Sequence, residues 1–137
     1  MRTKQVRPAK NEFEFEIHLS KQNDRITGKD FLFFDFRTTK TFENFIYRIN
    51  VTEEIKLDEN EIAFYVEGLS APVNALADHG QAYYHYKLFG FKNTEYYLKI
   101  IKQGKEKNNF KIKISKNGLK ITKEPPKKFI NIIINSD

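Results

Sequence analysis

One short segment, 78–86, collects the side chains best suited to metal or ligand chemistry. Asp78, His79 and His85 are potential metal ligands or acid–base groups, and Tyr84 stands next to His85. A histidine and a carboxylate together bind divalent metals, and functional side chains often lie on loops. The two histidines, however, do not have the spacing that established metal sites use. We therefore expect these residues to contact a partner, and we predict no metal and no other cofactor.

Catalytic arrangements are missing from the rest of the chain. Nucleophilic catalysis needs Ser, Thr or Cys beside a base and an orienting acid. The chain has 3 His, no Cys and no G-x-S-x-G frame around any Ser. Glycine-rich phosphate loops are absent as well. Glu12, Glu14 and Glu16 repeat on one strand face, a pattern typical of a solvated surface. We predict that this protein is not an enzyme.

Positive charge is concentrated in one C-terminal stretch. The formal net charge is +6, and residues 99–128 contain 11 Lys against 2 Glu. A block of this kind attracts anionic partners, although lysines also protect the edges of sheets against pairing with other chains. The lysines that we expect to contact a partner are Lys105, Lys107, Lys111, Lys113 and Lys120.

Single-stranded nucleic acid is the alternative partner for these lysines. Lysines combined with aromatic side chains are typical of the β-platforms that bind single-stranded DNA or RNA. Stacking requires exposed rings between the charges, and few rings lie in the lysine-rich stretch, where Arg is absent. Alternation also places Phe110 and Ile112 together on the core face. A protein is therefore the partner that we expect first, and nucleic acid is the alternative.

The elements that must position these residues are β-strands. Apolar and polar residues alternate along most of the chain, as in EFEFEIHL, and no stretch shows the helical period of 3.6. Short strands separated by turn signals indicate a sandwich or a small barrel. The predicted strands are 12–19, 30–37, 45–51, 61–67, 81–89, 94–102, 110–115, 119–122 and 129–134.

Two connections interrupt this alternation. Asn117-Gly118 is the strongest short hairpin signal, because both central residues of a type I′ turn need positive φ. That turn would place Ile114 opposite Ile121. The segment 68–80 contains Pro and two Gly and is predicted to be a long loop or a short helical turn.

The stretch YKLFGFKNTEYYLKI, 86–100, resembles the tyrosine corner of fibronectin type III domains. In that pattern Leu88 and Phe91 are the apolar anchors, Thr94 ends the turn and Tyr96 is the corner tyrosine. Its ring packs against the sheet edge while its hydroxyl satisfies a backbone group of the crossing connection. The resemblance implies an immunoglobulin-like architecture and carries no functional residues with it.

We therefore predict an all-β chain with a flexible N-terminal segment at 1–11 and a single domain over 12–137. The favoured fold is a two-sheet antiparallel β-sandwich of about 7–9 strands, immunoglobulin-like. A transthyretin-like sandwich or a small β-barrel fits the same strand pattern. No apolar run is long enough to cross a membrane. The compartment stays open, because a chain without Cys suits reducing and oxidising spaces alike, and a place in the cell envelope would require an export signal.

The function that we expect is non-enzymatic binding or assembly. The two predicted contact surfaces are the lysine-rich hairpin, 99–123, and the loop region 68–86. The predicted partner is a protein or another anionic molecule, and the alternative is a single-stranded nucleic-acid-binding β-domain.

Overall fold

The computed structural model describes residues 15–42, 48–70, 80–102 and 106–135, and these ranges form one continuous β-sheet. The only helical element within them is a 3-10 turn, η1 (Leu57–Glu59), and none of their helices is long and apolar enough to span a membrane. The strands are β1 (Phe15–Asn23), β2 (Asp30–Phe42), β3 (Arg48–Lys56), β4 (Glu61–Ser70), β5 (Gly80–Phe89), β6 (Glu95–Lys102), β7 (Glu106–Ser115), β8 (Gly118–Lys123) and β9 (Ile130–Ile134). The all-β prediction is confirmed, and each predicted strand overlaps one of these nine.

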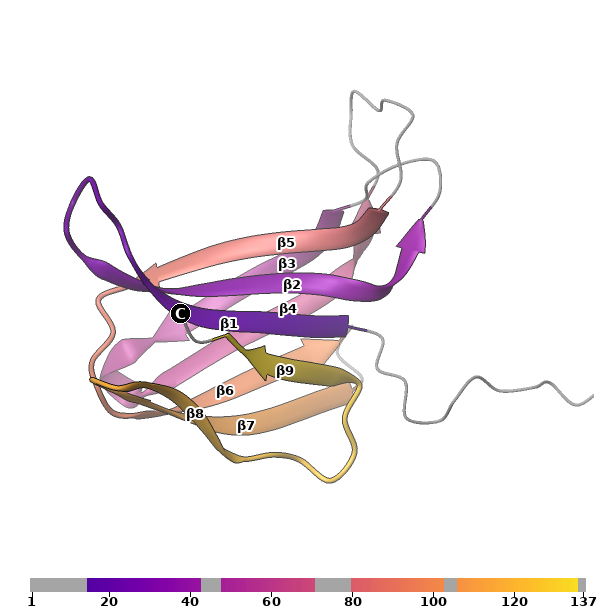
Figure 1. Cartoon of the computed structure of the whole chain (residues 1–137). Coiled ribbons are helices and arrows are strands. Elements are labelled where there is room, and N and C mark those ends of the chain that lie inside the picture. Colours follow the sequence, from indigo (N-terminus) through magenta and orange to yellow (C-terminus); the bar gives the residue numbers. More distant parts are fainter. Residues whose placement is uncertain (1–14, 43–47, 71–79, 103–105, 136–137) are drawn as a thin grey trace, which may run out of the picture.

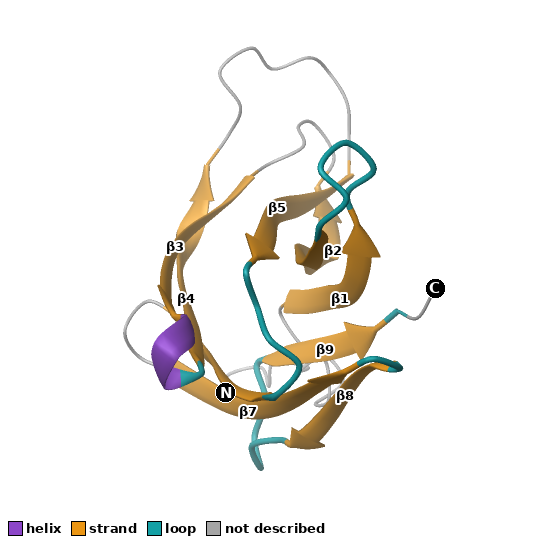
Figure 2. Ribbon diagram, turned by 90° about the vertical axis from the view of Figure 1, so that its left-hand side faces the viewer, coloured by secondary structure: helices purple, strands orange, loops and turns teal. Residues whose placement is uncertain are grey.

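The strands follow the order β8-β7-β6-β4-β3-β5-β2-β1-β9. The sheet curls until its edge strands, β8 and β9, approach each other, so that it nearly closes as a barrel (Figures 1 and 2). The pairings of β1 with β9, β3 with β5 and β4 with β6 are parallel. The expectation of a purely antiparallel fold was therefore wrong. A two-sheet immunoglobulin-like sandwich is not confirmed, whereas the small β-barrel is compatible with this sheet.

Aromatic rings fill the interior between the walls of the sheet. Phe64 of β4 is fully buried, and its ring centroid lies 5.0 Å from that of Phe34, 5.1 Å from that of Phe36 and 5.6 Å from that of Tyr86. Alternation places these rings on the inner face, as it does the apolar residues of the other strands. Further buried residues on predicted inner faces are Ile17, Leu19, Ile62, Val66, Phe110, Ile112, Ile114, Ile130 and Ile132.

One side chain joins the two ends of the sheet. Asn108 of β7 is 3% exposed, and its Nδ2 donates a hydrogen bond to the carbonyl oxygen of Lys127 at 2.9 Å. Its Oδ1 accepts from the N–H groups of Phe129 at 2.9 Å and Ile130 at 3.4 Å. In the described ranges no strand pairing connects β8 to β9. We call the gap between these edge strands the seam, and Asn108 bridges it where β9 begins.

The β7–β8 hairpin has a different register from the predicted one. Its turn ends at Asn117, and Gly118 is already the first residue of β8. Gly118 has φ of +136°, a conformation that favours glycine, but Asn117 does not have the positive φ of a type I′ turn. Ile114 consequently lies opposite Leu119 and not opposite Ile121.

The described ends of the predicted loop 68–80 are strands. β4 continues through Gly68 to Ser70, and β5 begins at Gly80. Gly68 lies where the register between β3 and β4 shifts, with φ of +139°, so a glycine suits this irregular position. Residues 71–79 lie outside the described ranges, as does the predicted flexible segment 1–11.

Candidate functional site

The outer face of the β7–β8 hairpin carries most of the lysines that were predicted to contact a partner. Lys107, Lys113 and Lys120 are exposed, and Lys111 is half-buried. The register places Lys113 directly opposite Lys120 and Lys111 opposite Lys123. Like charges in directly opposed positions destabilise an antiparallel pair. We call these five residues the lysine face; Lys105, which was also predicted, lies outside the described residues.

No carboxylate of the described residues forms an ion pair with a lysine of the lysine face. Nearby Lys99 of β6 differs, because its Nζ lies 2.7 Å from Oε2 of Glu61. That hydrogen bond lowers the pKa of Glu61 and raises the pKa of Lys99 relative to their ordinary values. The lysine face has instead an aromatic neighbour, since Lys111 Nζ lies 5.1 Å from the ring centroid of Tyr97, which is 50% exposed. The hairpin thus presents five lysines without ion pairs among the described residues, beside one exposed ring, and Glu95 of β6 is the one carboxylate in register with them, opposite Lys113.

The residues predicted from the region 68–86 are divided by the fold. Tyr84 faces the interior, where it packs against the core with its ring centroid 5.6 Å from that of Phe36. This position gives Tyr84 a structural role and argues against it as a contact residue. His85 points outward and is exposed. Asp78 and His79 lie outside the described residues, so their part in binding stays a prediction.

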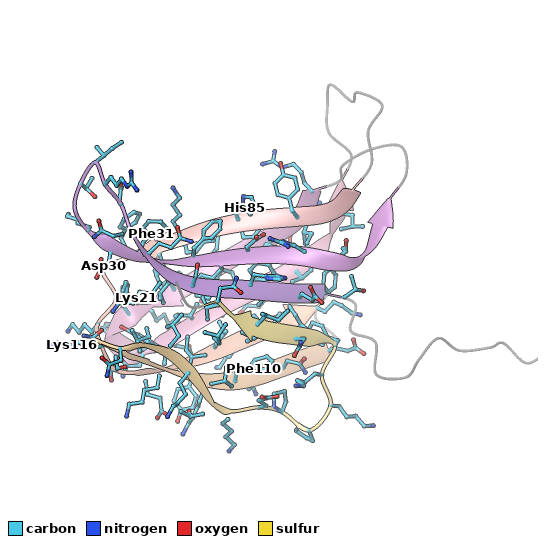
Figure 3. The ribbon with its side chains drawn as sticks, viewed as in Figure 1. Lys21, Asp30, Phe31, His85, Phe110 and Lys116 are labelled. Atoms are coloured by element: carbon cyan, nitrogen blue, oxygen red, sulfur yellow. The ribbon has the colours of Figure 1, made fainter. Side chains whose placement is uncertain are left out.

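His85 belongs to a row of aromatic rings along the outer face of β2 and β5. Successive ring centroids lie 5.2 Å apart from Phe89 to Phe31, 6.5 Å from Phe31 to Phe33, 5.3 Å from Phe33 to His85 and 5.0 Å from His85 to Tyr83. We call these five residues the ring strip. Phe89 is 39% exposed, whereas Phe31 is only 5% exposed although it faces outward. Figure 3 shows Phe31 and His85 on the β2–β5 side of the barrel, and Lys116 on the β7–β8 side.

Charged side chains lie between these rings. Asp35 is buried beneath Arg37, whose Nη2 and Nε donate to its Oδ2 at 2.7 Å and 3.1 Å. Asp35 Oδ1 makes no hydrogen bond with the described residues, although His85 Nε2 lies 3.2 Å away. Lys87 Nζ lies 5.1 Å from the ring centroid of Phe31. Within the described ranges, His, Asp and Glu nowhere form a group of three that could hold a metal ion.

Of the ring strip, only His85 was among the predicted site residues, although the sequence contained a signal for the other rings. The stretch FLFFDF, 31–36, has Phe on both faces of one strand, which is unusual for a strand with one solvated face. Its partner rings, Tyr83 and Phe89, lie on a strand distant in the sequence. Only the register between β2 and β5 brings them together.

The segment 86–100 makes the hydrogen bond that its resemblance to a tyrosine corner predicts. Tyr96 is buried, and its hydroxyl oxygen accepts from the N–H of Lys92 at 2.8 Å. Leu88 is buried and Phe91 packs against the core. This bond accounts for the local turn and leaves the family open, because one corner does not define an architecture. Comparison with protein-family models, with curated proteins and with solved structures finds no match to this chain.

Proposed function

We propose that this protein is a non-enzymatic binding module whose lysine face contacts an acidic segment of a partner protein. The observation that carries this proposal is the pairing of Lys113 with Lys120 and of Lys111 with Lys123. Each pair adds repulsion, and among the described residues no ion pair relieves it, although Glu95 of β6 lies opposite Lys113. Carboxylates from a partner would offset that repulsion by forming ion pairs with the lysines.

Protection of a sheet edge does not account for all of these lysines. β8 is an edge strand, so Lys120 and Lys123 are suited to discourage pairing with other chains. β7, in contrast, is paired on both sides, with β6 and with β8, and yet it carries Lys111 and Lys113 on its outer face. An acidic protein fits this face better than nucleic acid does, because Tyr97 is the one large exposed ring beside it in the described residues.

The double substitution K113Q/K120Q is the direct test of the lysine face. We expect it to weaken binding of a fluorescein-labelled poly-glutamate peptide about tenfold at low salt, because two close charges are lost. Binding by the unaltered protein should weaken as salt is raised. The same variant should unfold at a slightly higher urea concentration, by a few tenths of a kcal/mol, because cross-strand repulsion is removed. Fluorescence anisotropy and urea unfolding measure the two effects.

The matched control is K29Q/K87Q, which removes the same charge from exposed positions outside the lysine face. It should reduce peptide affinity much less than K113Q/K120Q does. Equal losses in the two variants would mean that net charge, and not this face, binds the peptide. An affinity that is insensitive to salt would also contradict the proposal.

A second candidate function, binding of single-stranded nucleic acid, is favoured by the ring strip. Proteins that bind single-stranded nucleic acid combine exposed aromatic rings with cations, and each base stacked on a ring contributes about 1–3 kcal/mol to the binding free energy. The ring strip supplies partly exposed rings at Phe33, His85 and Phe89, with Lys87 between them on the same outer face. Arg48 is exposed and pairs in register with Tyr83, which adds a second cation at the far end.

Labelled oligothymidine and oligouridine test this second function by fluorescence anisotropy at low salt. We expect F33A/F89A to weaken binding at least tenfold, because two stacking partners are removed. The control is Y97A, which removes a ring on the other side of the barrel and should leave affinity nearly unchanged. If neither oligonucleotide binds at low salt, or if Y97A is as damaging as F33A/F89A, this candidate function is excluded.

A further inference from the structure

Two hollows at one end of the barrel share Lys21 and Asp30. The first has a volume of about 640 Å³ and lies between the end of β1 and the β7–β8 turn, where Lys116 is part of its wall. The second has a volume of about 820 Å³ and extends toward the connection between β5 and β6, with Phe91 and Lys92 in its wall. Figure 3 shows Lys21, Asp30 and Lys116 together at this end of the barrel. Both hollows are open surface depressions and not enclosed cavities, and their volumes are in the range of small-molecule sites.

Lys21 occupies an inward position on β1. It continues the row of Ile17 and Leu19, which are fully buried, and it is itself half-buried. Its Nζ donates a hydrogen bond to the carbonyl oxygen of Ser115 at 3.2 Å and lies 5.9 Å from the ring centroid of Phe91. No carboxylate of the described residues forms an ion pair with it. A partly desolvated ammonium without a counter-ion is costly, and an anion in either hollow would offset that cost.

The rest of the wall is cationic as well. Lys29, Lys92 and Lys116 are exposed at the two hollows, whereas Asp30 is the one carboxylate among the described residues that line them. Asp30 Oδ1 already accepts a hydrogen bond from Asn23 Nδ2 at 2.9 Å. A concave surface with charge of one sign concentrates the field and attracts anions. Lysines bind phosphate groups as point charges.

We propose that this end of the barrel binds a small phosphate-bearing ligand. The phosphate contacts Lys21 and Lys116, and the apolar part of the ligand packs against Phe91. We call this the Lys21 site. It shares no residue with the lysine face, and it meets the ring strip only at Phe89 in the wall of the larger hollow, a residue that the variants below leave unaltered. The phosphate group could belong to a free metabolite or to a lipid headgroup, since both present the same chemistry to these lysines.

The experiment is a titration of the ¹⁵N-labelled full chain, followed through its backbone amide signals. The probes are inorganic pyrophosphate, adenosine monophosphate, and vesicles of phosphatidylcholine with and without phosphatidylglycerol. We expect saturable shifts at Lys21, Phe91 and Lys116 with at least one probe. Saturation by the free phosphates would identify a soluble ligand, and binding to the anionic vesicles alone would identify a headgroup. If no probe produces saturable changes at these amides, the proposal is overturned.

The substitution K21M keeps the aliphatic stem and removes the inward charge. We expect it to lower the affinity for the probe that gives saturable shifts about tenfold, because a charge-assisted contact is lost. K116M, at an exposed position with no partner among the described residues, should weaken binding by a smaller factor and is the second variant if K21M perturbs the fold. The matched control is K127M, at an exposed position outside the lysine face and outside both hollows. If K127M weakens binding as much as K21M and K116M do, the phosphate binds by net charge alone and the Lys21 site is disproved.

Discussion

The substitution F64A is expected to lower the free energy of unfolding by about 3–5 kcal/mol. Phe64 is fully buried and stands between the two walls of the sheet, in ring contact with Phe34, Phe36 and Tyr86. Truncation would remove these contacts and leave a cavity that the strands cannot fill, because both walls are held by backbone pairing. A loss of this size is a large part of the roughly 5–15 kcal/mol that stabilise an ordinary domain.

Urea unfolding followed by circular dichroism measures this loss, and Tyr86 provides a second readout. Burial raises the pKa of the Tyr86 hydroxyl, and the nearby charge of Glu53 raises it further. Water entering beside the truncated side chain should move that pKa back toward its ordinary value of 10.0. F64L is the control, because it keeps most of the volume and should cost about 1–2 kcal/mol. If F64A were no more destabilising than F64L, the cross-wall ring contacts would not be a main source of stability.

The strands and their inner faces were predictable because a period of 2 is a local property of the sequence. Phe15, Ile17 and Leu19 alternate with charged or polar residues, and all three are buried on one face of β1. The order of the strands was not predictable, because it depends on contacts between distant segments. β4 pairs directly and in parallel with β6, although β5 lies between them in the sequence, and β9 pairs in parallel with β1. No residue near these strands signals either pairing, so the sequence favoured a sandwich and left the small barrel only as an alternative.

The candidate sites divide in the same way between local and distant information. The outward position of Lys111 and Lys113 follows from alternation with the buried residues of β7. The opposition of Lys113 and Lys120 does not, because the predicted turn would have placed Ser115 opposite Lys120 instead. A shift of one residue in the turn therefore decided whether two charges repel each other.

The Lys21 site shows the same limit. Alternation along β1 places Lys21 on the inner face, after Phe15, Ile17 and Leu19. In the middle of a barrel, a lysine at such a position would be buried, whereas at the open end of the barrel it can reach solvent. β9 pairs with β1 only as far as Leu19, so Lys21 lies beyond the covered part of β1 and beside the open end. That distinction depends on where the C-terminal strand stops, which the residues around Lys21 do not encode.

The substitution N108A is expected to release the start of β9 and to cost roughly 2–4 kcal/mol, because buried backbone groups lose their partners. Alanine would leave the carbonyl of Lys127 and the N–H groups of Phe129 and Ile130 without the bonds that Asn108 makes. Hydrogen exchange should accelerate at Ile130 and Ile132 more than in β2, because β9 would then be held by β1 alone.

Two further variants test whether the hydrogen bonds of the Asn108 side chain hold β9 in place. N109A alters the exposed neighbour and should leave exchange in β9 unchanged. N108D keeps an acceptor for the Phe129 N–H but buries a carboxylate whose second oxygen faces the Lys127 carbonyl oxygen, so it should accelerate exchange in β9 at least as much as N108A does. Ile134 and Asn135, at the end of β9, line the smaller hollow. Loosening this strand should therefore also lower the affinity of the Lys21 site for its phosphate ligand. Unchanged exchange in N108A would show that β9 is held by pairing with β1 and by its buried isoleucines, and that the seam needs no bridge.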